Sequence, residues 1–223
     1  MIQKFCKPVG PSNTYNYFVG PNPCTTFVET SAFPKIDSSV FIGPFSSVIG
    51  DVTISSNVFI ACNVAIRADE GTPFYIGEDS NLQDGVILHG LAHKYVSIKH
   101  KKYSIYIGNR VSCAHGCVVH GPCYVGNNTF VGVNSVIFNA SVARDCFIGT
   151  GAIVTNGVVI KSNKFVPPGA IIDTQKKADA LGPVPTSSEE FTKEVLSINT
   201  EFPCSYSLLF GNTKCSCGLC CDR

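Results

Sequence analysis

Aliphatic residues recur every six positions through most of this chain. The first run keeps strict spacing, with Ile36, Ile42, Val48, Ile54, Ile60 and Ile66. The repeat resumes at Ile76 and again at Ile107, and it continues to Ile160 after a slip of one residue. A fixed short period over such a length is typical of a solenoid, in which each coil buries its apolar residues against the next.

The period and the residue types favour strands over helices. Six is far from helical spacing, and the repeat is rich in β-branched residues and glycine. The simplest solid is a triangular prism with one hexapeptide on each face, whose coils stack about 4.8 Å apart as parallel ladders. We therefore predict a parallel β-helix over residues 36–170. A mixed α/β domain, the runner-up, needs helical periodicity that residues 36–166 lack.

Segments without the repeat flank this domain. Residues 1–35 are rich in proline, glycine, asparagine and threonine, which predicts an irregular N-terminal arm over the start of the core. Residues 171–203 predict a C-terminal helical segment that covers a flank or an end of the prism. Residues 204–223 form a cysteine-rich tail.

The stronger helix of the C-terminal segment is expected over residues 187–199. Ser187 and Glu190 match a capping box at its start. One side of this helix is apolar and is expected to face the prism, with Phe191, Val195 and Ile198.

Charge and composition exclude several classes of protein. The net charge is +1, from 17 basic and 16 acidic residues, so a nucleic-acid-binding surface is not expected. No apolar run approaches the roughly 20 residues of a membrane span. The N-terminus has no apolar core of a signal peptide, so a cytoplasmic protein is expected. With only 15% charged residues, the chain is suited to burying surface against copies of itself.

The register of the prism sorts the polar residues into two groups. Residues 67–75 and 90–106 interrupt the repeat, and we treat both as inserted loops that are free to carry a site. Arg67, His89 and His120 then form one outward column, a ladder spacing apart. On another face, His115 lies above Asp84, with Gln83 beside it.

These two groups predict a metal site between chains. One prism is too thick for both groups to reach a single ion, but two chains reach it if the two faces pack together. Because the faces meet at about 60°, that contact closes a cyclic homotrimer. Three neutral imidazoles with an open fourth position suit catalytic Zn²⁺, and Fe²⁺ or Co²⁺ also suit them. Such an ion lowers the pKa of bound water to about 7.

Three segments, AIRADEGTPF, NLQDGVILHG and SCAHGCVVHG, resemble the γ-class carbonic anhydrases, in particular their carboxysomal members. The resemblance implies a left-handed β-helix, reversible hydration of carbon dioxide to bicarbonate, and a trimer with metal between subunits. The family's metal ligands map onto His89, His115 and His120. Carboxysome components are implied as partners, and the carboxysome as location, if the host is a cyanobacterium.

The resemblance also assigns roles to polar neighbours of the histidines. Arg67 and Asp84 look like an ion pair across the interface, at neighbouring heights on the prism. Glu70 looks like a carboxylate beside the metal that handles a proton or bicarbonate, with Asp69 as its structural neighbour.

Amide side chains look like the substrate-positioning group of the family. Gln83 and Asn81 match the pair that positions hydroxide and carbon dioxide. Asn199 matches a late asparagine near the pocket.

The loop over residues 90–106 departs from the archaeal-type pattern. It has no Asp or Glu, and carries His93 and His100, which are proton shuttles or surface residues. A catalytically silent or redox-latent assembly subunit is therefore the alternative to an enzyme. A hexapeptide acyltransferase, which uses a single catalytic histidine and a coenzyme A groove, and another metal-dependent hydrolase are weaker alternatives.

Cysteines fall into two groups. Four lie at repeat core positions and are expected to be small buried hydrophobes: Cys113, Cys117, Cys123 and Cys146. In the tail, the resemblance implies a regulatory disulfide that orders the C-terminal helix, for which Cys204 and Cys215 are the candidates. A thiolate metal site in the CxCxxCC motif and an unstructured tail remain alternatives.

Overall fold

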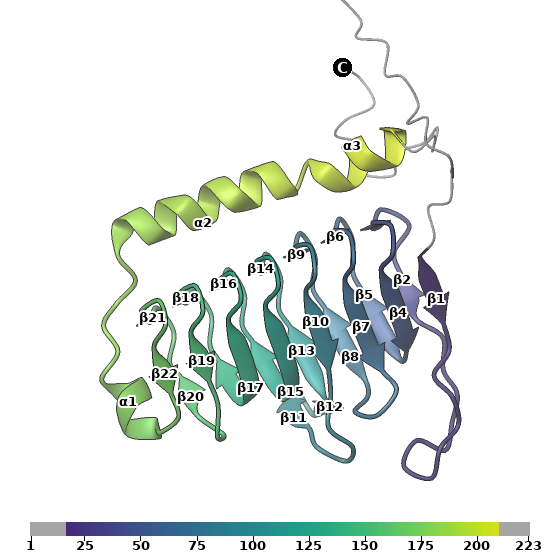
Figure 1. Ribbon diagram of the computed structural model, residues 1–223, viewed down its shortest axis with the longest axis horizontal. Coiled ribbons are helices and arrows are strands. Elements are labelled where there is room, and N and C mark those ends of the chain that lie inside the picture. Colours follow the sequence, from purple (N-terminus) through teal and green to yellow (C-terminus); the bar gives the residue numbers. More distant parts are fainter. Residues whose placement is uncertain (1–16, 210–223) are drawn as a thin grey trace, which may run out of the picture.

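The six-residue period builds a three-sided prism of short parallel strands, with helices along one flank (Figure 1). The computed structural model describes residues 17–209. The chain is a left-handed parallel β-helix, and the predicted fold is confirmed. Most repeat residues named above point inward and are buried; Ile60 and Ile66, for example, are fully buried. Each such side chain contributes about 1.5–3 kcal/mol through removal from water.

The first side of the prism, which we call the histidine face, runs from the N-terminal arm to the last coil. Its strands are β1 (Phe18–Gly20), β4 (Ser47–Gly50), β7 (Ala65–Ala68), β10 (Ile87–His89), the first half of β15 (Val118–Val125), the first half of β17 (Val136–Val142), β19 (Ile153–Val154) and β22 (Ile171–Ile172). The arm is therefore not wholly irregular, because β1 pairs in parallel with β4. The solenoid also extends past residue 170, through β22.

The other two sides complete each coil. The tyrosine face consists of β2 (Lys35–Ile36), β5 (Val52–Ile54), β8 (Phe74–Ile76), β13 (Ile105–Ile107), the second halves of β15 and β17, and β20 (Val159–Ile160). The helix face consists of β3 (Phe41–Ile42), β6 (Phe59–Ile60), β9 (Asn81–Leu82), β14 (Ser112–Cys113), β16 (Phe130–Val131), β18 (Phe147–Ile148) and β21 (Phe165–Val166). Within the loop 90–106, β11 (Val96–Ile98) and β12 (Lys101–Tyr103) pair as an antiparallel hairpin.

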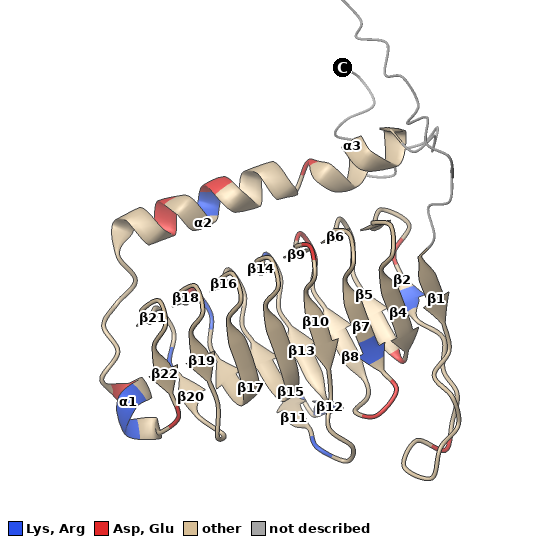
Figure 2. Cartoon of the chain, viewed as in Figure 1, with Lys and Arg blue, Asp and Glu red and all other residues tan. Residues whose placement is uncertain are grey.

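Many corners of the prism are turned by residues with positive φ. Asparagine dominates this set, with Asn57, Asn63, Asn128, Asn134, Asn139, Asn156 and Asn163. Asparagine tolerates the left-handed region because its short polar side chain bonds locally to the backbone. Most charged residues also lie at turns and on the helices, so the strands themselves carry little charge (Figure 2).

Helices α1 (Gln175–Asp179), α2 (Thr186–Asn199) and α3 (Phe202–Leu209) follow the solenoid. On the helix face, Phe130 and Phe147 stack with centroids 4.8 Å apart, and Phe191 of α2 meets both rings edge-on. Phe202 of α3 packs on Phe59 at a tilt, with ring centroids 5.1 Å apart. The predicted flank cover is confirmed. No helix within residues 17–209 has the length and apolar character needed to cross a membrane.

The details of α2 correct three expectations. The helix begins at Thr186 after Pro185, which makes no side-chain cap, so the capping box predicted at Ser187 does not form. Phe191 faces the prism as expected, although it is 45% exposed, whereas Ile198 is 48% exposed, because the buried side of α2 coincides only in part with the predicted one. That side consists of Thr192, Leu196 and Asn199. Helix α3 also begins before the predicted tail and extends into it.

Candidate metal centre

Two histidines lie side by side on the histidine face. Strand register pairs His89 with Arg67 on one side and with His120 on the other, so the predicted outward column is confirmed. His89 Nδ1 lies 3.2 Å from His120 Nε2. The column forms because each residue follows an inward-pointing aliphatic residue in the same coil position, and side chains alternate along a strand.

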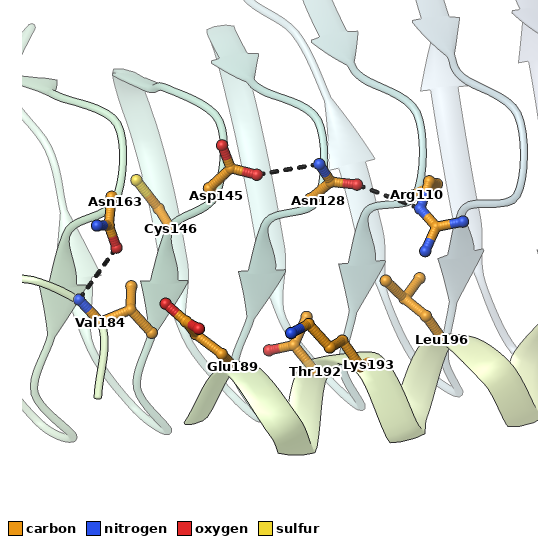
Figure 3. A pocket seen from close by; sticks show the side chains of 10 residues that line it. All are labelled: Arg110, Asn128, Asp145, Cys146, Asn163, Val184, Glu189, Thr192, Lys193 and Leu196. Carbon is orange, nitrogen blue, oxygen red and sulfur yellow. Dashed lines mark hydrogen bonds between the residues drawn. The ribbon is translucent and has the colours of Figure 1, made fainter. Parts of the chain in front are cut away.

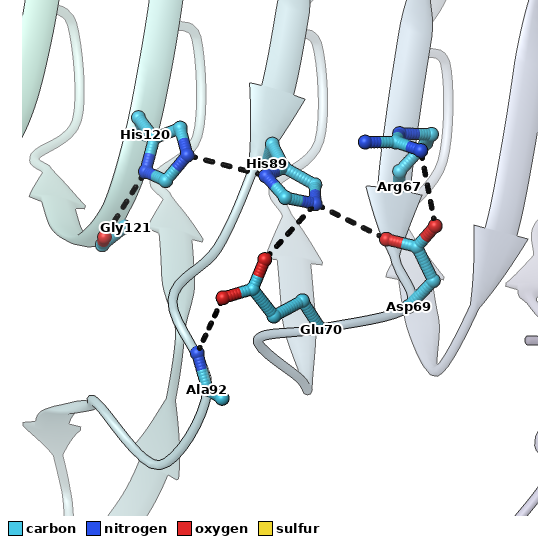
Figure 4. Close-up of polar contacts among 7 residues, drawn as sticks. All are labelled: Arg67, Asp69, Glu70, His89, Ala92, His120 and Gly121. Carbon is cyan, nitrogen blue, oxygen red and sulfur yellow. Dashed lines mark hydrogen bonds and ion pairs between the residues drawn. The ribbon is translucent and has the colours of Figure 1, made fainter. Parts of the chain in front are cut away.

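The remaining nitrogen of each ring faces an oxygen (Figure 4). His89 Nε2 lies 3.2 Å from Asp69 Oδ1, and His120 Nδ1 lies 3.4 Å from the carbonyl of Gly121. Both oxygens are acceptors, so each favours the tautomer with its proton on the outer nitrogen. In these tautomers both inner nitrogens are acceptors, and they lie 3.2 Å apart.

Carboxylates from the turn after β7 surround this pair. Asp69 also binds Arg67, with Nη1 to Oδ2 at 3.2 Å. Glu70 Oε2 lies 3.9 Å from His89 Nε2, and Glu70 Oε1 accepts a hydrogen bond from the Ala92 amide at 3.4 Å. The structure thus brings five predicted residues and the loop 90–106 together: Arg67, Asp69, Glu70, His89 and His120.

The surroundings of His120 favour its neutral form. Burial lowers the pKa of His120, and the neighbouring His89 lowers it further, against the opposing effects of the Gly121 carbonyl and Glu70. His89 is itself only 15% exposed. Neutral imidazole is the form that binds a metal.

His115 lies elsewhere on the same chain. It occupies the turn between β14 and β15, at the corner between the helix face and the histidine face. Its Nδ1 lies 3.1 Å from Asp84 Oδ2, which confirms that the two residues stack. Both side chains are more than half exposed, His115 at 58%. Asp84 Oδ1 also accepts from the Cys62 amide at 3.1 Å.

An amide cluster lies under the end of α2. Gln83 Nε2 donates to Asn81 Oδ1 at 2.8 Å and to Asn199 Oδ1 at 2.7 Å. Asn81 is fully buried and donates to Ser112 Oγ at 2.8 Å. This polar group interrupts the phenylalanine column of the helix face. The three predicted amides therefore meet one another, although Asn199 is 116 residues from Gln83 in sequence.

The spacing of His89 and His120 is compatible with two ligands of one zinc ion. Two nitrogens bound to one zinc ion at tetrahedral angles lie about 3.3 Å apart, close to the observed spacing of His89 and His120. Within residues 17–209, no group of three or more His, Cys, Asp or Glu side chains is placed to hold a metal. One chain thus offers two adjacent imidazoles, those of His89 and His120, and an exposed third imidazole, that of His115, at another corner.

One geometric expectation needs correction. The helix face was predicted to pack against the histidine face of the next copy, but α2 and α3 of the same chain cover it. The corner with His115 and Asp84 remains exposed. Arg67 and Asp84 each pair within the chain, with Asp69 and His115 respectively, so their pairing across an interface stays a prediction.

Cysteines behave largely as predicted. The four core cysteines are free and buried. Burial raises the pKa of the Cys123 thiol to about 12 and that of Cys146 to about 11. Cys204 is buried and disulfide-bonded. Its predicted partner Cys215 and the CxCxxCC motif lie outside the described residues.

A groove of about 620 Å³ lies between α2 and the corner of the prism (Figure 3). A polar ladder crosses it: Arg110 Nε donates to Asn128, and Asn128 donates to Asp145. None of the predicted site residues lines this groove. The groove therefore lies away from His89, His115 and His120, and it does not indicate a site at these histidines.

Two contact residues escaped the sequence analysis. Ser112 holds Asn81, and the Phe138 ring lies 5.1 Å from the His120 ring. Ser112 pairs in register with Asn81, and Phe138 pairs in register with His120. Both could have been predicted by counting one coil further along the ladder from a predicted residue.

Comparison with known proteins identifies the family. No protein-family model matches the chain. It is 43% identical over 194 residues to the carboxysome assembly protein CcmM of Nostoc sp.. The matched region covers 86% of this chain and 35% of that protein. It is 38% identical over 170 residues to the carbonic anhydrase of Methanosarcina thermophila, covering 72% of this chain and 68% of that enzyme. The chain thus spans about a third of the length of the Nostoc protein.

More distant relatives agree. The mitochondrial gamma carbonic anhydrase 2 of Arabidopsis thaliana is 30% identical over 138 residues, covering 62% of this chain and 46% of that protein. Among solved structures, a hexapeptide transferase family protein from Anaplasma phagocytophilum has a TM-score of 0.63 at 23% identity, covering 80% of this chain and 94% of that one, which shows the fold alone. The chain therefore belongs to the γ-class carbonic anhydrase family, close to the N-terminal domain of CcmM.

Proposed function

We propose that the chain hydrates carbon dioxide reversibly to bicarbonate at the interfaces of a cyclic homotrimer. One observation carries the proposal. The inner nitrogens of His89 and His120 converge at 3.2 Å on one face, while His115, the third predicted ligand, is exposed at a corner of the prism. A neighbouring copy is therefore the natural source of the third imidazole.

This arrangement supports an assignment of the metal ligands. His89, His120 and His115 of the partner subunit would hold the ion, with Zn²⁺ the first choice and Fe²⁺ or Co²⁺ also suited to imidazole. A bound ion supplies Lewis acidity, which makes hydroxide available at neutral pH.

Residues around the ligands orient them. Asp69 accepts from His89 Nε2 and fixes the tautomer that presents Nδ1. Arg67 holds Asp69 in place, and its half-exposed guanidinium has donors left for Asp84 of the partner subunit.

Substrate and proton are handled by other side chains. Gln83 uses its amide group as donor to Asn81 and Asn199, which leaves its oxygen free to accept a hydrogen bond from water or hydroxide. Glu70 is close to His89 and 39% exposed, so it can take a proton at the site and release it to solvent.

The surface of the histidine face supports self-association. Ile87, Phe138 and Ile171 are 43%, 38% and 52% exposed along this face. Contiguous exposed apolar side chains are typical of interaction sites, and contact with another copy would remove them from water.

A catalytically silent or redox-latent assembly subunit is the second candidate. It is favoured by the 43% identity to CcmM, a carboxysome assembly protein, and carboxysome components would then be the partners. The disulfide at Cys204, next to the end of α2, supports redox control of either function. An acyltransferase is less favoured, because the converging histidine pair has no role in it.

One experiment separates these functions. The purified chain is assayed for bound metal, oligomer mass and carbon dioxide hydration, with and without reductant. About one ion per chain, a trimer and hydration activity in at least one redox state support the enzyme. Stoichiometric metal without activity in either state would favour the silent subunit, and a metal-free, monomeric chain would refute both the site and its assembly.

A further inference from the structure

Ser104 has a buried hydroxyl with no hydrogen-bond partner among the described residues. It lies where the hairpin β11–β12 rejoins the prism, just before β13. Its backbone is fully used: the amide donates to the Pro73 carbonyl at 2.8 Å, and the carbonyl accepts from the Cys123 amide at 2.9 Å. The backbone therefore ties the coil of Ser104 to the coils on either side, while the hydroxyl has no such role.

Three glycines from three successive coils surround this hydroxyl. A Cβ atom placed on Gly71, Gly90 or Gly121 would lie 2.3, 2.2 or 2.9 Å from Ser104 Oγ. Real Cβ contacts are longer, so only bare Cα atoms fit around the hydroxyl. The Gly71 and Gly90 backbones also meet directly, since a Cβ on Gly71 would lie 2.7 Å from Gly90 Cα.

Each of these glycines directly follows a residue of the half-site. Gly71 follows Glu70, Gly90 follows His89, and Gly121 follows His120. One side-chain oxygen therefore touches the backbone beside the carboxylate and beside both histidines. The Ser104 side chain is thus close to all three glycines at this corner.

An unpartnered buried hydroxyl calls for a reason. It loses its bonds to water without replacement, and alanine at the same place would avoid that cost. The volume of the hydroxyl offers the reason here, because it fills the gap between three glycines and sets how closely their strands approach.

We propose that Ser104 is a positioning residue of the metal centre, whose hydroxyl acts as a spacer that fixes Glu70, His89 and His120 relative to one another. This rests on the proposed function. The chelating nitrogens are 3.2 Å apart, so a small shift of either strand end moves the lone pairs away from a common point.

The test compares three variants of the full chain, using Zn²⁺ alone as probe. Ser104→Ala removes the spacer, and Ser104→Cys replaces it with a sulfur atom. Ser46→Ala is the matched control, because Ser46 is also buried but its hydroxyl bonds to the Ala61 carbonyl at 2.8 Å and to the Val64 amide. Zinc affinity is measured by competition with a chromophoric chelator, and the melting temperature of each variant is measured without metal.

Ser104→Ala is expected to weaken zinc binding by at least about tenfold at an unchanged or raised melting temperature, and Ser104→Cys to weaken it as well, because the larger sulfur atom forces the glycines apart. Ser46→Ala is expected to lower the melting temperature and leave zinc affinity unchanged. If Ser104→Ala binds zinc as tightly as the wild type, or if its affinity falls only as its melting temperature falls, the inference about Ser104 is overturned. The proposed function is not affected by that result. A wild-type chain that binds no zinc would overturn the proposed function, and this inference with it.

Discussion

His89 Nδ1 and His120 Nε2 lie 3.2 Å apart, and the outer nitrogen of each ring faces an acceptor oxygen. This contact is a hydrogen bond when either ring carries a proton on its inner nitrogen. When both protons lie on the outer nitrogens, it brings two lone pairs together, and a cation between the rings would relieve that contact.

A mixing experiment tests whether the third ligand comes from another copy. His89→Ala and His115→Ala chains are each expected to lose zinc binding. Co-expressed, they should form mixed trimers in which about a third of the sites combine an intact histidine face with an intact His115. Zinc content and hydration activity of the doubly tagged hybrid measure this recovery. Hybrids no better than the single variants would show that the site does not form between chains.

Asp69→Asn should weaken zinc binding by about 10–100-fold with little change in stability, because it removes the carboxylate that orients His89. Asp145→Asn is a matched control, since Asp145 also pairs with an arginine but lies at the groove beside α2. Calorimetric titration with Zn²⁺ gives both affinities. Equal affinities for the two variants would exclude the orienting role.

The buried side of α2 predicts different costs for two neighbouring residues. Leu196→Ala should lower the free energy of unfolding by about 2–5 kcal/mol, because Leu196 is buried against the prism. Ile198→Ala should change it by less than about 0.5 kcal/mol, since Ile198 is 48% exposed. Urea unfolding of both variants measures the difference. A larger loss at Ile198 would support the helix orientation expected from sequence.

Thiol alkylation should distinguish the cysteines of the folded chain. With a raised pKa of about 11, only about one in a thousand Cys146 thiols is ionised at pH 8, and burial also blocks reagent. Cys123, at about 12, should be less reactive still, whereas the exposed Cys24 should react first. Peptide mapping after brief iodoacetamide treatment shows the order. Early labelling of Cys123 would contradict the buried assignment.

Asp179 predicts a small acid-sensitive contribution to stability. Its hydrogen bond to Lys161, at 3.1 Å, lowers the pKa of Asp179 in the folded chain, helped by Gln175. The stabilisation is therefore present above the unfolded pKa of about 3.9 and is lost as pH falls through the lower folded value. Asp179→Asn should melt slightly lower than wild type at pH 7 and together with it at pH 2. A difference that persists at pH 2 would point to another cause.

The sequence predicted the register of the histidines because the repeat is strict. Each six residues complete one face, so counting from Leu88 to Val119 places His89 next to His120, and counting from Leu82 to Cys113 places His115 above Asp84. Loop lengths do not disturb this count, since both loops leave and rejoin the prism at the same corner. Half of the candidate site thus follows from periodicity.

Contacts of α2 and of Ser104 could not be predicted in this way. The side expected for α2 was wrong at Ile198, because the surface under the helix is a column of phenylalanines and amides from strands up to 116 residues away. Ser104 sits in an insertion without a repeat, so nothing in the local pattern indicates that it meets three glycines.

By itself, the sequence determined the prism, its core and the order of residues along each ladder. The reason is that each face takes one six-residue repeat, so equivalent residues of successive coils pair with one another. Only the tertiary structure decided which face the helices cover, which corner remains open with His115, and which neighbours orient His89 and His120. These depend on side-chain volume and hydrogen bonding between segments far apart in the chain, which no local period encodes.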